Sequence, residues 1–181
     1  MITIVDNGRG SQEISRMIRS KNQILKPASV KSFEGAFILS DGPISPDNKK
    51  VAAKILENAS GPVMGIGAGM AYIAAFYGAS IKDGKASQKQ EQISLKKPSP
   101  LLLDFKKVFT AVVASGCTIG DLPENFSVHA SSKSCEFEII QDTEKPFFGV
   151  RFSPELGQDG LRILGNFEKF IEMWGKYHNS G

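Results

Sequence analysis

The segment whose residue types and spacing most directly suggest chemistry is 65–69, which reads GIGAG. An apolar run at 62–66 enters this glycine-rich turn, and a second apolar run leaves it at Met70. A strand that passes through a sharp turn into a helix is the layout of a nucleophile elbow, which presents a reactive side chain at its tip. Here the tip residue is Gly67, which has no side chain. The segment therefore predicts the backbone of a nucleophilic site without its nucleophile.

Few other residues are available to replace the missing nucleophile or to act as a base. The chain has two cysteines, Cys117 and Cys135, and two histidines, His129 and His178. A reactive thiolate needs a lowered pKa and a neighbouring base, and no histidine lies near Cys117 in the sequence. Alternation along 126–132 predicts that His129 points outward at the surface. None of the four residues has the spacing of a metal site, so neither a metal nor another cofactor is expected.

The composition excludes several other classes of function. The chain has 181 residues, 41% of them hydrophobic and 23% charged, which suits one domain with a buried core. Its net charge is +3 and its lysines are scattered, with no basic stripe, so no nucleic-acid partner is predicted. No apolar run approaches the ~20 residues that span a bilayer, so no membrane partner is predicted. Because the cysteines form no disulfide framework and no secretory signal is present, we expect a cytoplasmic protein.

The elements that would position an elbow alternate between strand and helix over the N-terminal half. The predicted strands are apolar runs rather than alternating patterns, which is typical of a parallel sheet covered by helices on both faces. Ser11 and the pair Ser45-Pro46 are predicted to cap the first two helices. The strands are expected at 2–5, 23–25, 35–40 and 62–66, and a third helix at 70–78.

The second half is richer in strands, which are bounded by turn residues. They are expected at 92–96, 107–114, 126–132, 135–140 and 145–152. A last helix is predicted at about 158–176, and residues 177–181 are expected to fray. We therefore predict an α/β fold in a single domain, 1–176. It has a central, mostly parallel sheet flanked by helices, with a small antiparallel strand cluster.

Five ordered segments give the chain a specific resemblance to a known family. It resembles class I glutamine amidotransferase domains, and most of all the separate glutaminase subunit of archaeal GMP synthases, over nearly its whole length. The resemblance implies a flavodoxin-like α/β fold, glutamine hydrolysis by a Cys-His-Glu triad, and partnership with an ATP-pyrophosphatase subunit. The segments are IVDNGRGSQEISRMIRS, GAFILSDGPIS, PVMGIGAGMAYIAAFYGA, LPENF and ASSKSCEFEIIQDTEKPFFGVRFSPEL.

Carried onto this chain, the resemblance implies a degenerate catalytic triad. In the family a thiolate attacks the side-chain amide of glutamine, a histidine moves the proton, and a glutamate orients the histidine. The nucleophile position is Gly67 and the base position, in F-H-P-E, is Ser153. The orienting carboxylate is retained as Glu155. Without a histidine to orient, Glu155 is expected to be held by a structural hydrogen bond, or to pair with Ser153.

The positions that would hold substrate and intermediate are also altered. The two backbone N–H groups that hold the oxyanion in the family map to Gly42 and Ala68. The H-Q pair that follows the elbow is Met70-Ala71, and the first glycine of the G-G-P loop is Asp41. We expect Asp41 to be a solvated loop residue. If it points inward instead, it would repel an anionic substrate and favour a cation.

Three functions remain open from the sequence. The favoured one is a catalytically inactive amidotransferase-like protein that binds or regulates the ATP-pyrophosphatase subunit of GMP synthase. The alternative is an active amidotransferase with a non-standard nucleophile, for which Cys117 is the candidate because it lies in the loop that faces the pocket in the family. The third is a sensor that binds a small molecule in the vacated glutamine pocket, where Gly67, Met70, Ala71 and Ser153 would open space.

Overall fold

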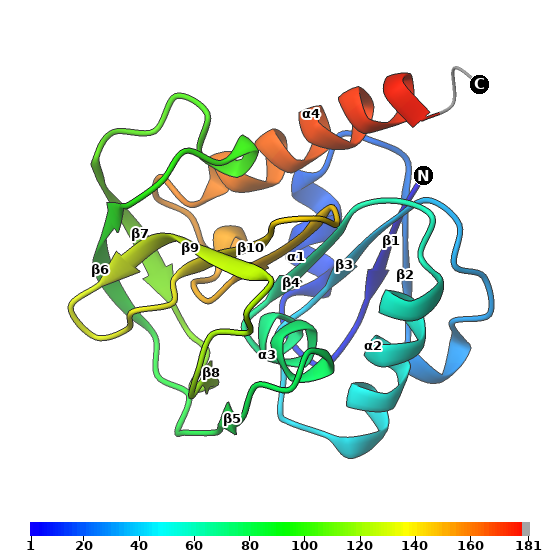
Figure 1. Cartoon of the computed structure of the whole chain (residues 1–181), viewed down its shortest axis with the longest axis horizontal. Helices are drawn as coiled ribbons and strands as arrows, with labels where there is room; N and C mark the ends of the chain where they lie inside the picture. The colour runs from blue at the N-terminus through cyan, green and yellow to red at the C-terminus, as the bar shows by residue number, and fades with distance from the viewer. Residues whose placement is uncertain (179–181) are drawn as a thin grey trace.

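The computed structural model describes residues 1–178 and is built on one large twisted sheet (Figure 1). Within these residues the sheet has nine strands in the order β2-β1-β3-β4-β11-β10-β9-β6-β7. A second sheet pairs only β5 with β8. The expected α/β fold, with a parallel sheet and an antiparallel strand cluster, is confirmed, and most of the antiparallel strands continue the large sheet.

The parallel half of the sheet is formed by the apolar runs of the sequence. Strand β1 lies between β2 and β3, and β4 lies between β3 and β11, with all four pairings parallel. Their bounds are Ile2–Val5 for β1, Asn22–Leu25 for β2, Ala36–Leu39 for β3, Val63–Ile66 for β4 and Phe147–Val150 for β11. Four of these strands are buried at every position, as expected for strands covered on both faces.

The antiparallel half follows β11 to one edge of the sheet. Strand β9 occupies residues 126–132, as predicted, while β10 begins four residues later than the expected run at 135–140. The small sheet pairs β5 with β8 next to the end of α3. The bounds are Ile139–Asp142 for β10, Phe126–Ser132 for β9, Lys89–Leu95 for β6, Val108–Val113 for β7, Ile81–Lys82 for β5 and Thr118–Ile119 for β8.

Helices cover both faces of the sheet and create a hydrophobic core on each (Figure 1). One core packs α1 and α4 against the sheet, and the other packs α2 and α3. The helices are Ser11–Met17 (α1), Pro46–Asn58 (α2), Ala68–Phe76 (α3) and Leu161–His178 (α4), with short 3-10 turns at Pro27–Ser29 (η1), Pro100–Leu102 (η2) and Pro154–Leu156 (η3). No helix within residues 1–178 is long and apolar enough to cross a bilayer.

Helix ends agree with the sequence where a local cap decides them. The Ser45 hydroxyl accepts a hydrogen bond from the N–H of Asn48, and Pro46 opens α2, as predicted. Ser11, the predicted cap of α1, is instead the first residue of that helix, and Gly10 precedes it in a left-handed conformation. Helix α4 begins three residues later than expected and extends through His178, so two of the residues expected to fray are helical. The rest of that predicted tail, 179–181, lies outside the described residues.

The topology brings several loops to one edge of the sheet. Because β1, β3, β4 and β11 run parallel, their carboxyl ends meet there. Ligands in open parallel sheets bind outside the carboxyl ends of the strands. The elbow, the loop of Asp41 and the segment of Ser153 to Glu155 all follow these ends. The sheet therefore assembles the predicted site residues in one region.

Candidate functional site

The elbow between β4 and α3 has the close-packed backbone that the sequence predicts. A Cβ built on Gly69 would overlap the carbonyl oxygen of Leu39, and one built on Gly65 would lie 2.5 Å from the N–H nitrogen of Met70. Glycine at both positions is therefore required for the strand and the helix to approach. Gly67 has φ 56° and ψ −112°, and its N–H donates to the Val150 carbonyl at 2.8 Å. Such a positive φ strains any residue other than glycine.

The tip of the elbow is filled by the carboxylate of Asp41. A Cβ built on Gly67 would overlap Oδ1 of Asp41 and lie 2.9 Å from Oγ of Ser115. The Asp41 side chain has no exposed surface, so the expectation of a solvated loop residue is wrong. Its Oδ1 accepts hydrogen bonds at 2.9 Å from the Ala68 N–H and from the Ser115 hydroxyl. The space that a nucleophile at position 67 would need is already occupied.

An arginine and a polar loop hold the Asp41 carboxylate in place. Nη1 of Arg9 lies 2.9 Å from Oδ2 of Asp41, and the backbone N–H of Arg9 donates to the Asp41 carbonyl. The Asn7 side chain donates to the Ser40 carbonyl, while the Asn7 N–H donates to the Ser40 hydroxyl. These bonds link the loops after β1 and β3. Both oxygens of the buried carboxylate are therefore satisfied, as a buried charge requires.

The two positions assigned to an oxyanion hole differ in their surroundings. The Ala68 N–H already donates to Asp41 and is not free to receive an intermediate. Gly42 packs against the loop after β1, where a built Cβ would overlap the Asn7 carbonyl oxygen. An oxyanion hole works through donors that point at the position of developing charge. Here one of the two donors is bound to a side-chain carboxylate.

Ser153 and Glu155 are buried, and each has a side-chain oxygen without a hydrogen-bond partner. Ser153 is 1% exposed and Glu155 is 4% exposed, yet neither Oγ of Ser153 nor Oε2 of Glu155 has a partner. The expected Ser153–Glu155 pair is therefore wrong, whereas the expected structural hydrogen bond is present in part, because the Glu155 carboxyl group accepts a hydrogen bond from its own backbone N–H. Burial, with Asp41 and Glu13 nearby, raises the pKa of Glu155 to about 7. A buried carboxyl group is easier to protonate than a solvated one, because burial disfavours its charged form.

Cys117 lies in the same loop as Ser115, but it lacks the environment of a nucleophile. It is 3% exposed, and its backbone N–H donates to the Ser115 hydroxyl at 3.2 Å. Burial raises the pKa of the thiol to about 12, and the negative charges of Asp83 and Asp41 act in the same direction. At neutral pH the sulfur is therefore protonated, and a thiol is a much weaker nucleophile than a thiolate.

Met70, Ala71 and Ser153, which were expected to open space at the elbow, are all buried. Met70 and Ala71 are each 1% exposed and pack in the core of the α2–α3 face. A cleft of about 530 Å³ lies instead beside the elbow, lined among others by Gly8, Arg9 and Glu155. Of the predicted site residues, only Glu155 lies on its wall.

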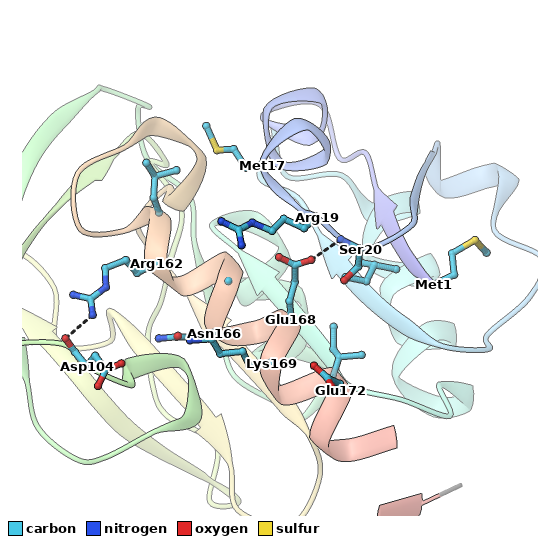
Figure 2. Close-up of a pocket in the computed structure, with 14 residues that line it drawn as sticks. Met1, Met17, Arg19, Ser20, Asp104, Arg162, Asn166, Glu168, Lys169 and Glu172 are labelled. Carbon is cyan, nitrogen blue, oxygen red and sulfur yellow. Dashed lines mark hydrogen bonds between the residues drawn. The ribbon is translucent and has the colours of Figure 1, made fainter. Parts of the chain in front are cut away.

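A larger groove, of about 970 Å³, lies away from the elbow (Figure 2). It is formed by α4, the end of α1 and the first residues of β1, whose opposite end carries the site. Figure 2 shows the Glu168 carboxylate accepting a hydrogen bond from the Ser20 N–H, and Arg162 donating one to the Asp104 carbonyl. These contacts belong to a polar surface, and they do not bring catalytic side chains into contact with one another.

The histidines and the second cysteine lie apart from the site. His129 is 7% exposed, which corrects the expectation of a surface residue. Its ring nitrogens lie 2.7 Å from the Pro98 carbonyl and from the Ser127 hydroxyl, and burial lowers its pKa. His178 stacks on Trp174 in α4. Cys135 is buried and its sulfur lies 3.3 Å from the Thr118 hydroxyl. None of these side chains reaches Asp41 or Glu155 by a hydrogen bond in the described structure.

Arg9 and Ser115, which both donate hydrogen bonds to the Asp41 carboxylate, are not among the predicted site residues. Arg9 belongs to the turn DNGRG, which follows the carboxyl end of a predicted parallel strand. That position is a usable signal, because ligand-binding loops follow such strand ends. Ser115 lies in the segment SGCT, where nothing in the sequence favours its hydroxyl over the thiol of Cys117. No group of three or more potential metal ligands occurs within residues 1–178.

The chain is similar in sequence to known amidotransferases. A family described as glutamine amidotransferase class-I matches residues 5–171. A glutamine-hydrolysing GMP synthase subunit from Methanococcus aeolicus is 32% identical to this chain, over 97% of the chain and 100% of the relative. The subunit of the same description from Pyrococcus abyssi is 29% identical, over 93% of the chain and 97% of the relative.

Two solved structures share the fold. A Thermoplasma acidophilum protein, described as a candidate GMP synthase subunit, superposes with a TM-score of 0.84 at 22% identity, covering 98% of this chain and 95% of that one. A glutamine amidotransferase from Thermotoga maritima superposes with a TM-score of 0.67 at 17% identity, covering 99% and 85%. At these identities the likeness concerns the fold alone.

Proposed function

Because this chain belongs to the class-I glutamine amidotransferase family, we propose that it is a glutaminase-fold subunit that does not hydrolyse glutamine. It acts instead as a binding or regulatory partner. The observation that carries the proposal is the Asp41 carboxylate, which fills the tip of the elbow and binds the Ala68 N–H. A thioester cannot form at a glycine, and the space beside it is occupied by the Asp41 carboxylate and the Ser115 hydroxyl.

The size of the expected loss supports this proposal. Removing the nucleophile or the base of a comparable triad enzyme lowers kcat on the order of a millionfold. Here Gly67 and Ser153 stand at both positions. Cys117 is a poor substitute, because its pKa is about 12 and no histidine side chain bonds to it in the described structure. Any residual rate of glutamine hydrolysis would have to come from substrate binding alone.

The proposed partner is an ATP-pyrophosphatase subunit of GMP synthase, which would then use free ammonia. The support is the coverage of the relatives, since the Methanococcus aeolicus GMP synthase subunit is matched over its whole length. Both cysteines within the described residues are free thiols, which supports a reducing compartment such as the cytoplasm.

The test is a glutaminase assay of the purified chain, alone and mixed with the candidate ATP-pyrophosphatase subunit from the same organism. We expect no ammonia release above a glutamine blank in either sample, and co-elution of the two proteins in gel filtration. The Methanococcus aeolicus relative, measured with its own partner, serves as the positive control. Ammonia release that is lost in Cys117→Ser would establish the alternative of an unusual nucleophile. Absence of co-elution would remove the proposed partner.

A further inference from the structure

The cleft beside the elbow contains a buried carboxyl group that no residue fully satisfies. Glu155 lies on the cleft wall and is 4% exposed, and its Oε2 atom has no hydrogen-bond partner. Leaving a buried polar group unsatisfied is unfavourable, so such groups call for an explanation. A bound molecule with hydrogen-bond donors would provide one.

The backbone at Gly10, which also lines the cleft, leaves room for this carboxyl group. A Cβ built on Gly10 would lie 2.5 Å from Oε1 of Glu155, so the carboxyl group rests against bare backbone. Gly10 has φ 80°, a conformation that favours glycine. In this cleft the Glu155 carboxyl group therefore lies against the loop that follows β1. The cleft volume of about 530 Å³ is in the range of small-molecule sites.

The charges around the cleft favour a cation. Its titratable lining residues are Arg9, Glu13 and Glu155. The Arg9 guanidinium is already paired with Asp41 at 2.9 Å. The net charge that a ligand meets in the cleft is therefore set by the two glutamates. Above the pKa of Glu155, an anionic ligand would meet two carboxylates without a free cationic partner. The remaining lining side chains carry no charge, and they include Ala86, Ser87, Gln88 and Leu156.

We propose that this cleft binds a small organic cation, a primary amine or a guanidinium compound, whose N–H groups donate hydrogen bonds to Glu155. A divalent metal fits less well, because no group of three or more potential ligands occurs within residues 1–178 and such ions generally take about six or more oxygen ligands. The inference does not depend on whether the chain hydrolyses glutamine or on its partner, because it rests only on the cleft, its charges and the unpartnered Oε2 atom of Glu155.

The test is a titration of the isotope-labelled full chain with ethylamine hydrochloride and with agmatine, followed by backbone-amide NMR. Sodium chloride at equal ionic strength and sodium acetate are the controls. We expect saturable shifts at the amides of Gly8, Gly10 and Glu155 with the amines only. Glu155→Gln should weaken binding at least about tenfold, while Glu57→Gln, an exposed glutamate on α2, should leave the affinity unchanged.

A second readout separates this site from general charge attraction. The groups facing Glu155 are Asp41 and Glu13, which raise its pKa, and Arg9, which lowers it. Because burial raises that pKa to about 7, raising the pH from 6 to 8 should increase the affinity for an amine that stays charged about tenfold. Amine shifts that persist in Glu155→Gln, shifts located on another surface, or an absence of saturable binding would each overturn the proposal.

Discussion

Asp41 accepts a hydrogen bond from the backbone N–H of Ala68 at 2.9 Å. In an acyl-transfer enzyme, an N–H at this position of the elbow would bind the negative oxygen of a tetrahedral intermediate. Here a side-chain carboxylate supplies the negative oxygen permanently, and Arg9 and Ser115 complete its bonds. The same geometry that would stabilise an intermediate therefore stabilises the folded protein.

The first prediction is that Asp41→Asn destabilises the protein. The substitution conserves volume but removes the charge, and its amide NH₂ would face either Arg9 or the Ala68 N–H, which are both donors. Hydrogen bonds to charged groups contribute ~1.5–3 kcal/mol, so we expect the free energy of unfolding to fall by about 2 kcal/mol. Urea unfolding followed by circular dichroism measures this change.

The matched control is Asp83→Asn, because Asp83 is an exposed aspartate near the loop that carries Ser115 and Cys117. Its free energy of unfolding should stay within about 0.5 kcal/mol of the wild-type value. Equal stabilities of the two variants would mean that the Asp41 carboxylate contributes nothing to the fold.

The second prediction concerns Gly67→Cys, which should lower stability without creating a glutaminase. The new Cβ would overlap Oδ1 of Asp41, and cysteine would have to adopt φ 56°. Backbone strain of this kind costs ~1–3 kcal/mol and overpacking a similar amount, so a loss of about 3 kcal/mol is expected. Thermal unfolding and an ammonia assay, run on the same sample, check both parts.

A double-mutant cycle tests the cause of that loss. In the Asp41→Gly background the overlap is absent, so Gly67→Cys should cost at least about 1 kcal/mol less than in the wild type. Additive effects would show that strain alone is responsible. A Gly67→Cys variant that melts higher than the wild type, or that releases ammonia from glutamine, would contradict the prediction directly.

Residues decided by local patterns could be predicted from the sequence. The apolar runs at 2–5 and 62–66 form buried parallel strands, and the glycines at 65 and 69 allow the close strand–helix approach. Ser45 caps α2 because its partner, the N–H of Asn48, lies three residues away. In each case the atoms that decide the outcome belong to a short stretch of chain.

The environment of Asp41 could not be predicted in this way. Its partners Arg9 and Ser115 lie 32 and 74 residues away in sequence, so only the assembled sheet shows that the carboxylate is buried and satisfied. The prediction that His129 points outward is wrong for a related reason. Ile139 pairs with Ala130 and Ile140 with Val128, so His129 is the extra residue of a bulge, and alternation is lost there.

The third prediction is that Cys117 is unreactive in the folded protein. With its pKa raised to about 12, the thiolate fraction at pH 8 is on the order of a thousandfold lower than that of an ordinary thiol. In a Cys135→Ser variant, which leaves Cys117 as the one thiol, alkylation by iodoacetamide at pH 8 should be slower by at least this factor than in urea. Rapid labelling of the native variant would reopen the case for Cys117 as a nucleophile.

The last prediction uses the titration of Glu155. Its folded-state pKa is raised from 4.5 to about 7, so between these values the folded state holds a proton that the unfolded state has lost. Stability therefore falls as the pH rises through this window, and a shift of this size corresponds to about 3 kcal/mol. Glu155→Gln mimics the protonated group and lacks this dependence. Its free energy of unfolding should match the wild type near pH 4.5 and exceed it by about 3 kcal/mol at pH 8, as measured by urea unfolding at each pH. Because other groups titrate equally in both proteins, the difference isolates Glu155. A difference that does not change with pH would show that its carboxyl group titrates normally in the folded state.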